Sequence, residues 1–328
     1  MALRQAPKTD FAAHLMAISS GVVGADVRLV RGRERVEAIT QVMQRARLAD
    51  PSGGVWEAAD LQWWWRQQRP SDEFGVPVWE DQFGPCAAVN VMDCLGRAHA
   101  DRDGRSDDSG RGGARWQVDL FVVPGTVDLQ QMWSGLAELI EQHRPALIEI
   151  VARDDDQALT DRLTAGAFTP FGEPLPIVWM DTANRTPPFR PADGFRIVDR
   201  ASMRADNHHW GSSVEARLNE CSLYDPRLDL AMIAPNGEVA GYALFWADLV
   251  TGVGMLEPMR VNDAYQRQGL AKALLTSGLD RLAQLGTRRI KVTFDRYAGR
   301  DLQARGAFTT TGSARMWKSG GKFSWVSP

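Results

Sequence analysis

The sequence predicts an α/β (α+β) protein built from two tandem copies of one domain, each a mixed, mostly antiparallel sheet with flanking helices. The first observation is an internal repeat, because Gly-Ala-Phe-Thr at 166–169 recurs at 306–309, an offset of 140 residues (306 − 166). The second is a shared order of strand, helix and strand, which precedes the repeated tetrapeptide in both copies. Two copies of one domain explain both observations.

A proline-rich segment separates the copies. Pro187, Pro188 and Pro191 discourage helix between the two repeats. A chain of 328 residues is also long for one core and sufficient for two domains of ordinary size. We therefore expect a first domain over residues 1–185, a linker over 186–193 and a second domain over 194–328.

The first copy shows both hydrophobic periods. Alternating or continuous apolar residues predict its strands, and apolar residues at helical spacing predict its helices. Segment 99–115 is rich in Asp, Arg, Gly and Ser, so we expect a loop there. In chain order the expected elements are strand 27–30, helices 34–48 and 60–67, strands 76–80, 86–92 and 118–123, helix 129–142 and strand 146–151.

The second copy opens with a strand over 195–198, followed by a polar helical region over 202–220. The Asn-Gly pair at 236–237 supplies the positive φ angles of a tight turn. It predicts a hairpin. The expected hairpin strands and the later elements are strands 228–234, 238–247 and 254–261, a helix that begins at residue 270, and strand 289–294.

A glycine turn joins the third of these strands to the helix. Residues 266–271 read Gln-Arg-Gln-Gly-Leu-Ala, so Gly269 stands where the helix begins. Unpaired backbone N–H groups and the positive end of the helix dipole hold phosphate groups at such a place, and the missing Cβ allows close approach. Arg267 and Lys272 add positive charge. The pattern indicates a pyrophosphate-binding turn, with a plain strand-to-helix connection as the alternative.

The order strand, Q-x-x-G-x-A turn, helix, strand and short helix ending at residue 308 resembles the GCN5-related N-acetyltransferase (GNAT) superfamily over most of 194–318. The resemblance implies a sheet whose fourth and fifth strands splay apart, so that the pantetheine arm of the co-substrate acetyl-CoA lies in the gap. Main-chain groups of Met259 and Val261 would contact pantetheine, and the turn would hold the pyrophosphate. The binding residues that the resemblance implies are Met259, Arg260, Val261, Gln266, Arg267, Gln268, Gly269, Leu270, Ala271 and Lys272.

The first copy lacks this turn. Its corresponding segment, 124–129, reads Pro-Gly-Thr-Val-Asp-Leu. Asp128 would cap the following helix well, but a carboxylate there would repel a pyrophosphate. We therefore expect the first copy to lend structure or cleft walls rather than to bind CoA.

The resemblance implies direct attack of an amine on the acetyl thioester, with a base that removes the ammonium proton. Glu257, on the strand before the turn, is the candidate base. Strand alternation places it on the same face as Met255 and Met259. An ion pair with Arg260 or Arg289 is the alternative explanation of this carboxylate.

The acid that protonates the departing thiolate is harder to assign. The tyrosine usual in the family is replaced by Leu302. Tyr297, one turn earlier, is a weak candidate acid, with a partly buried structural tyrosine as the alternative. The thiolate can also take its proton from water.

Three other groups of residues receive a structural interpretation. The tryptophans at 63–65 cannot all face one side of a helix, so core packing plus a domain interface is favoured over substrate binding. His208 and His209 lack the i, i+4 spacing of a helical metal site and are expected at the surface. Cys221 is expected to pack rather than to carry an acyl group.

Composition excludes several classes. An apolar fraction of 44% and a charged fraction of 24% are typical of a soluble globular protein. A formal net charge of −3 predicts no nucleic-acid or anionic-membrane partner. No apolar stretch approaches the length needed to cross a bilayer, so a cytoplasmic location is expected. The three cysteines predict neither a metal site nor a disulfide framework, and the excess of arginine over lysine favours a GC-rich bacterial genome.

Three functional hypotheses follow. The leading one is an N-acetyltransferase that acts from the second domain on a small-molecule or peptide amine, as a monomer or a homodimer. The alternative is a non-catalytic acyl-CoA-binding or sensing protein, which the missing tyrosine favours. Mycothiol synthases and aminoacyl-tRNA-dependent peptidyl transferases also pair two such domains, but the Q-x-x-G-x-A turn and the low net charge favour CoA over aminoacyl-tRNA.

Overall fold

The computed structural model describes residues 25–94, 114–203, 210–293 and 308–320. Its first half contains the expected strands and helices and two further elements, helix α5 and strand β6. In chain order the elements of this half are β1 (Asp26–Val30), α2 (Gly32–Ala49), α3 (Ala58–Trp65), β2 (Val76–Asp81), β3 (Gly84–Asp93), β4 (Arg115–Val122), α4 (Leu129–His143), β5 (Leu147–Arg153), α5 (Gln157–Ala165) and β6 (Thr169–Asp181).

The second half also follows the expected order as far as the strand after α7, and it ends in a further strand, β12. The short helix expected to end at residue 308 lies outside the described residues. In the polar helical region expected over 202–220, the described residues 210–220 contain one short α-helix, α6. The elements of this half are β7 (Arg196–Asp199), α6 (Ser212–Leu218), β8 (Asp229–Ile233), β9 (Val239–Asp248), β10 (Val253–Val261), α7 (Leu270–Gln284), β11 (Arg289–Thr293) and β12 (Thr309–Gly320). Short 3-10 helices are η1 (Pro70–Glu73), η2 (Thr182–Asn184), η3 (Arg200–Ser202) and η4 (Asp263–Tyr265).

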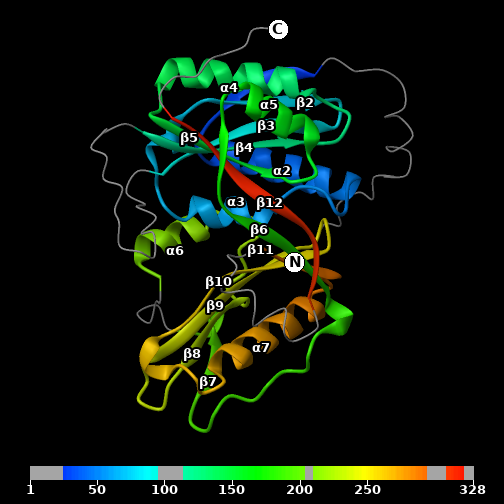
Figure 1. Ribbon diagram of the computed structural model, residues 1–328. Helices are drawn as coiled ribbons and strands as arrows, with labels where there is room; N and C mark the ends of the chain where they lie inside the picture. The colour runs from blue at the N-terminus through cyan, green and yellow to red at the C-terminus, as the bar shows by residue number, and fades with distance from the viewer. Residues whose placement is uncertain (1–24, 95–113, 204–209, 294–307, 321–328) are drawn as a thin grey trace.

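All of these strands belong to one sheet, in the order β1-β2-β3-β4-β5-β12-β6-β11-β10-β9-β8-β7. The two halves therefore exchange their last strands. Strand β12 from the end of the chain lies antiparallel to β5 of the first half, and β6 of the first half lies antiparallel to β11 of the second. The two exchanged strands also pair with each other. In Figure 1 the red ribbon of β12 runs from one half of the molecule into the other.

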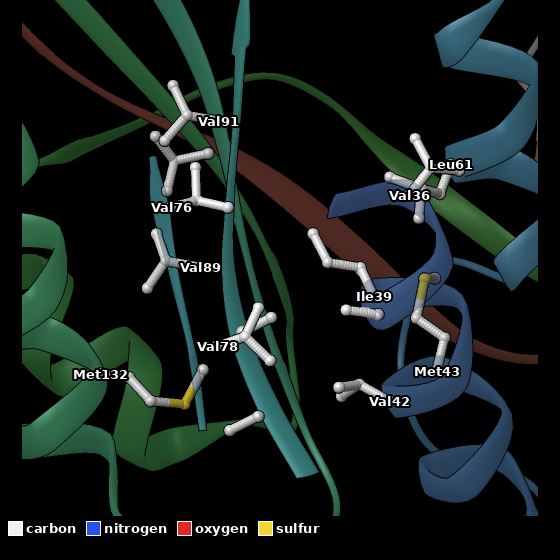
Figure 2. Close-up of a cluster of buried hydrophobic side chains, with 14 of the residues drawn as sticks. Val36, Ile39, Val42, Met43, Leu61, Val76, Val78, Val89, Val91 and Met132 are labelled. Carbon is white, nitrogen blue, oxygen red and sulfur yellow. The ribbon is translucent and has the colours of Figure 1, made fainter. Parts of the chain in front are cut away.

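Helices cover both faces of the sheet in the first half. Figure 1 shows α4 and α5 on one face and α2 and α3 on the other. The core follows the same division, since Met132 of α4 packs on one side of the strands and Ile39 and Val42 of α2 pack on the other (Figure 2). These three side chains are at most 1% exposed. Apolar burial on both faces fixes the register of the strands between them.

In the second half, α7 packs on β9 through a glycine. A Cβ at Gly278 would lie 2.0 Å from Cε2 of Phe245, so any larger residue would push the helix off the sheet. The buried leucines Leu274 and Leu282 of α7 lie in the same apolar cluster as Phe245. This contact fixes the position of the N-terminus of α7, where the glycine turn begins.

The two halves meet along α3 and α6. Trp63 and Trp65 are 5% and 6% exposed, and the Trp65 indole N–H donates to Glu220 at 2.8 Å. Trp64 is partly buried and lies edge-on to Trp56, with ring centroids 5.1 Å apart. The prediction that these tryptophans serve core packing and an interface between the halves is confirmed.

Candidate functional site

The glycine turn has the backbone of an anion cradle. Gly269 has φ +77° and is the residue before the first turn of α7. Arg267, with φ +62°, is also left-handed. Residues 266–269 are exposed, and no side chain forms a capping hydrogen bond at the start of α7. Backbone groups arranged in this way bind phosphate.

Phe189, in the predicted linker over residues 186–193, lies against this turn. The Phe189 N–H donates to Thr276 Oγ1 of α7 at 2.8 Å, and the Lys272 ammonium lies 4.3 Å from the centre of the Phe189 ring. A Cβ at Gly269 would meet Phe189 Cε1 at 3.2 Å. The turn therefore leaves no free space for a side chain at position 269, and it has a basic residue, Lys272, beside it. These features fit a bound pyrophosphate.

The other predicted binding residues of the turn differ in exposure and in hydrogen bonding. The exposed Gln266 amide donates to Asp263 Oδ1 at 2.9 Å and to the Val261 carbonyl at 3.4 Å, so this side chain holds the turn against β10. Ala271 is exposed and Leu270 is buried in the core beneath α7.

Beyond Met255, β10 has no partner among the described residues on its β11 side. The two strands pair in parallel at Val253–Met255, and none of residues 256–261 pairs with a described residue of β11. On its other side β10 pairs with β9, with a register shift between Leu256 and Met259. Met259, Arg260 and Val261 therefore carry backbone groups on an edge that an extended ligand can occupy.

The register shift corrects one expectation about Glu257. Met255 packs in the core beneath α3, whereas Met259 packs in the cluster beneath α7. Two β10 residues, Glu257 and Pro258, lie between the paired positions, so the alternation is reversed across them. The prediction that Met255 and Met259 share a face is wrong for this reason.

Glu257 lies close enough to α3 to act on its charges. Burial, and then the Glu257 charge, raise the pKa of Asp60 well above its usual range. Asp60 is 3% exposed, and its Oδ2 accepts the Glu57 N–H at 2.6 Å. A carboxyl group from the first half thus faces the candidate base of the second half. No motif in the sequence marks Asp60.

A buried ion network lies beside this pair. Lys291 of β11 is 1% exposed and donates to Glu57 Oε1 at 2.9 Å. Arg47 of α2 donates to the same carboxylate at 2.5 and 3.1 Å. The pKa of Glu57 is lowered, because Lys291 and Arg47 outweigh the penalty of burial. Side chains from both halves therefore meet beneath the candidate site.

The arginines named as alternative partners of Glu257 can now be placed. Arg289 donates to the Pro51 carbonyl at 2.7 Å and lies over the Trp179 ring at 4.5 Å. Arg260 is exposed on β10. The candidate acid Tyr297 and the position Leu302 lie outside the described residues.

Other predicted features have mixed outcomes. Cys221 is buried, its thiol contacts the Gln62 carbonyl at 3.4 Å, and burial raises its pKa to about 12, which agrees with packing. His208 and His209 lie outside the described residues. Within the described part of the chain, no cluster of His, Cys, Asp or Glu is placed to hold a metal ion. The same part contains no helix that is both long and apolar enough to span a membrane.

In the first half, the helix start is closed by a side chain. Asp128 Oδ1 accepts the Gln131 N–H at 2.7 Å, and the Gln131 side chain accepts the Asp128 N–H at 3.2 Å. The predicted cap on α4 is therefore confirmed. Its carboxylate occupies the place that a phosphate would take at α7.

Comparison with known proteins identifies the second half. Residues 195–307 match the model of the acetyltransferase (GNAT) family. This region is a GNAT domain. The match contains the open edge of β10, the glycine turn and α7, and it supports acyl transfer as the class of reaction.

Solved structures show that the GNAT fold extends over both halves. A tandem GNAT protein from the clavulanic acid biosynthesis pathway is 15% identical, with a TM-score of 0.60 over 92% of this chain and 100% of that one. A GCN5-related N-acetyltransferase from Sphaerobacter thermophilus is 16% identical, with a TM-score of 0.52 over 92% of this chain and 97% of that one. No curated protein matches the chain. These comparisons confirm the predicted fold class of two tandem GNAT-like units.

Proposed function

We propose that the protein is an acyl-CoA-dependent N-acyltransferase whose second half transfers an acetyl group from acetyl-CoA to a primary amine. The observation that carries the proposal is the glycine turn at the start of α7 next to the open edge of β10. The glycine turn would bind the pyrophosphate, and the edge of β10 would bind the extended pantetheine arm. The GNAT match over the same residues supports this reading.

In the proposed reaction, the amine nitrogen attacks the thioester carbonyl, a C–N bond forms and the C–S bond breaks. Glu257 takes the proton that the amine loses, and the departing thiolate takes a proton from solvent or from a nearby acid. Lys291 of the Lys291–Glu57–Arg47 network pairs with Met255 of β10, so this network and Asp60 support the β10 segment that carries Glu257. The acceptor is a small-molecule or peptide amine.

A titration of acetyl-CoA into the Gly269→Glu variant tests the site. The new side chain would bring bulk and negative charge into the cradle, against Phe189, so we expect affinity to fall roughly a hundredfold or more, about 2.7 kcal/mol. Gly286→Glu is the matched control. Gly286 follows the other end of α7, has φ +94° and has nothing within 4 Å of a Cβ.

The control places the same residue in the same kind of backbone without touching the turn, so its affinity should stay at the wild-type level. Equal losses in the two variants would contradict the assignment of the turn to the pyrophosphate. Release of free CoA when amines are supplied then separates an acyltransferase from a protein that only binds acyl-CoA.

A further inference from the structure

The first half contains a cavity at the position that corresponds to the proposed pantetheine gap. Strands β4 and β5 pair from Arg115 with Leu147 to Val118 with Ile150 and then separate. A cavity of about 210 Å³ lies beyond the last pair. Its apolar walls come from α2, the loop before α3 and the two strands: Met43, Val55, Trp56, Leu120, Phe121 and Val151.

A buried carboxyl group lies at this cavity. Asp119 is 3% exposed and is the first residue of β4 beyond the parallel pairing. Its Oδ1 accepts the Trp56 indole N–H at 2.9 Å, but its Oδ2 has only two long contacts, at 3.5 Å, with the amides of Asn90 and Gln117. No described cation forms an ion pair with it.

A second buried acceptor lies beside the first. Asn90 pairs with Asp119 across β3 and β4, and its side chain is completely buried. The Asn90 Oδ1 atom has no hydrogen-bond partner among the described residues. Of these two buried oxygen atoms, Asp119 Oδ2 has only long hydrogen bonds and Asn90 Oδ1 has none, whereas buried polar groups normally have well-placed donors.

The arginines at the cavity are already neutralised. Arg47 is paired with Glu57 at 2.5 Å, and Arg153 is paired with the carboxylate of Asp155 at 2.7 Å. Arg153 also donates to the Ser52 carbonyl at 3.0 Å.

The other two carboxylates that line the cavity, Asp50 and Asp156, accept hydrogen bonds from backbone N–H groups. Asp50 Oδ1 accepts the N–H groups of Ser52 and Gly53, and Asp156 Oδ1 accepts the Leu159 N–H at 3.0 Å. Asp119 is therefore the lining carboxylate that remains for a ligand.

We propose that this cavity binds a small primary ammonium compound, whose charged nitrogen donates to Asp119 and whose hydrocarbon body lies against Trp56 and Phe121. An ammonium group supplies several N–H donors from one atom, and aromatic faces attract cations. Hard metal ions need six or more oxygen ligands, which one carboxylate and one amide do not provide. The volume suits a small molecule rather than a drug-sized one. The proposal is independent of the transfer reaction in the second half.

Calorimetric titration of the full-length protein with benzylamine at neutral pH, without acetyl-CoA, tests the proposal. Benzyl alcohol is the uncharged molecule of nearly the same shape. We expect one benzylamine site per chain, with benzyl alcohol bound at least roughly tenfold more weakly. No benzylamine binding, or equal binding of the two compounds, would overturn the proposal in favour of a cavity that holds water.

Variants locate the site. Asp119→Asn keeps the shape and removes the charge, so benzylamine affinity should fall roughly tenfold, to the level of benzyl alcohol. Ala46→Phe fills the cavity from α2 and should remove binding of both compounds. Circular dichroism shows whether each variant is folded.

Glu257→Gln is the control in the second half, and it should leave benzylamine binding unchanged. Loss of binding in Glu257→Gln with retention in Asp119→Asn would place the amine at the proposed transferase site and overturn the proposal. An active enzyme that binds no benzylamine at Asp119 would overturn this inference alone.

Discussion

In both halves a pair of parallel strands separates after a few residues, β4 from β5 and β10 from β11. The halves differ in the residue that precedes the following helix. Parallel pairing begins at Arg115 in the first half and at Val253 in the second, and four residues further along each strand stands a carboxyl residue, Asp119 or Glu257. In both strands this residue lies just beyond the last parallel pair, which is Val118 with Ile150 or Met255 with Lys291. An acidic residue at the point of separation is thus common to both halves.

The N-termini of the two corresponding helices, α7 and α4, differ in whether their backbone N–H groups are capped. In the second half the residue before α7 is Gly269, whose left-handed backbone leaves helix N–H groups open. In the first half the residue before α4 is Asp128, whose carboxylate already accepts one of those groups. Both halves have a splayed strand pair, so the acyl-CoA site proposed for the second half rests on the open helix start of α7.

The largest expected effect tests whether the halves are energetically separate. Glu57→Gln would leave Arg47 and Lys291 buried side by side without their shared carboxylate, so we expect the free energy of unfolding to fall by about 3–5 kcal/mol. Urea unfolding measures this change. Glu37→Gln, which removes the exposed pair with Arg33, should cost less than about 1 kcal/mol. Equal midpoints for the two variants would show that the buried network does not join the halves.

The next effect concerns the carboxylate at the second separation point. Glu257→Gln removes the proposed base, so we expect kcat at neutral pH to fall roughly a hundredfold. At high pH the amine loses its proton unaided, and the deficit should shrink. Glu238→Gln is the control, because Glu238 is an exposed carboxylate of the same half that accepts the Tyr265 hydroxyl. A deficit that is the same at every pH would favour a structural role for Glu257.

The smallest effect concerns the carboxyl group at the first separation point. Burial raises the pKa of Asp119 from 3.8 to about 6. The folded state therefore prefers the neutral form, and this preference stabilises the protein below about pH 4 and is lost as pH rises through about 6. Two pKa units correspond to about 3 kcal/mol at most.

Asp119→Asn should remove this loss, so the variant should be more stable than wild type at neutral pH by about 1–2 kcal/mol and no more stable at pH 4. Thermal unfolding at the two pH values gives the difference. A variant that is destabilised by the same amount at both would show that the carboxylate form is satisfied in the folded protein.

Local features of the site could be read from the sequence. The glycine at 269, the aspartate cap at 128 and the strand that carries Glu257 each depend on a few neighbouring residues. Asp60 was missed because its role depends on a contact between α3 and β10, almost 200 residues apart. The side on which Met259 packs was missed because a register shift, which no hydrophobic pattern marks, reverses the alternation.

The domain boundaries at 185 and 194 stay a prediction. They do not express the exchange of strands β6 and β12 that the sheet order shows. The sequence by itself determined two copies of one fold, the anion cradle in one copy and the capped helix in the other, because turns and helix caps are local interactions. The exchange of β6 and β12 was decided by tertiary structure alone. Backbone hydrogen bonds between strands are nearly the same for any sequence, so a strand's partner is chosen by the packing of whole layers rather than by the residues of the strand.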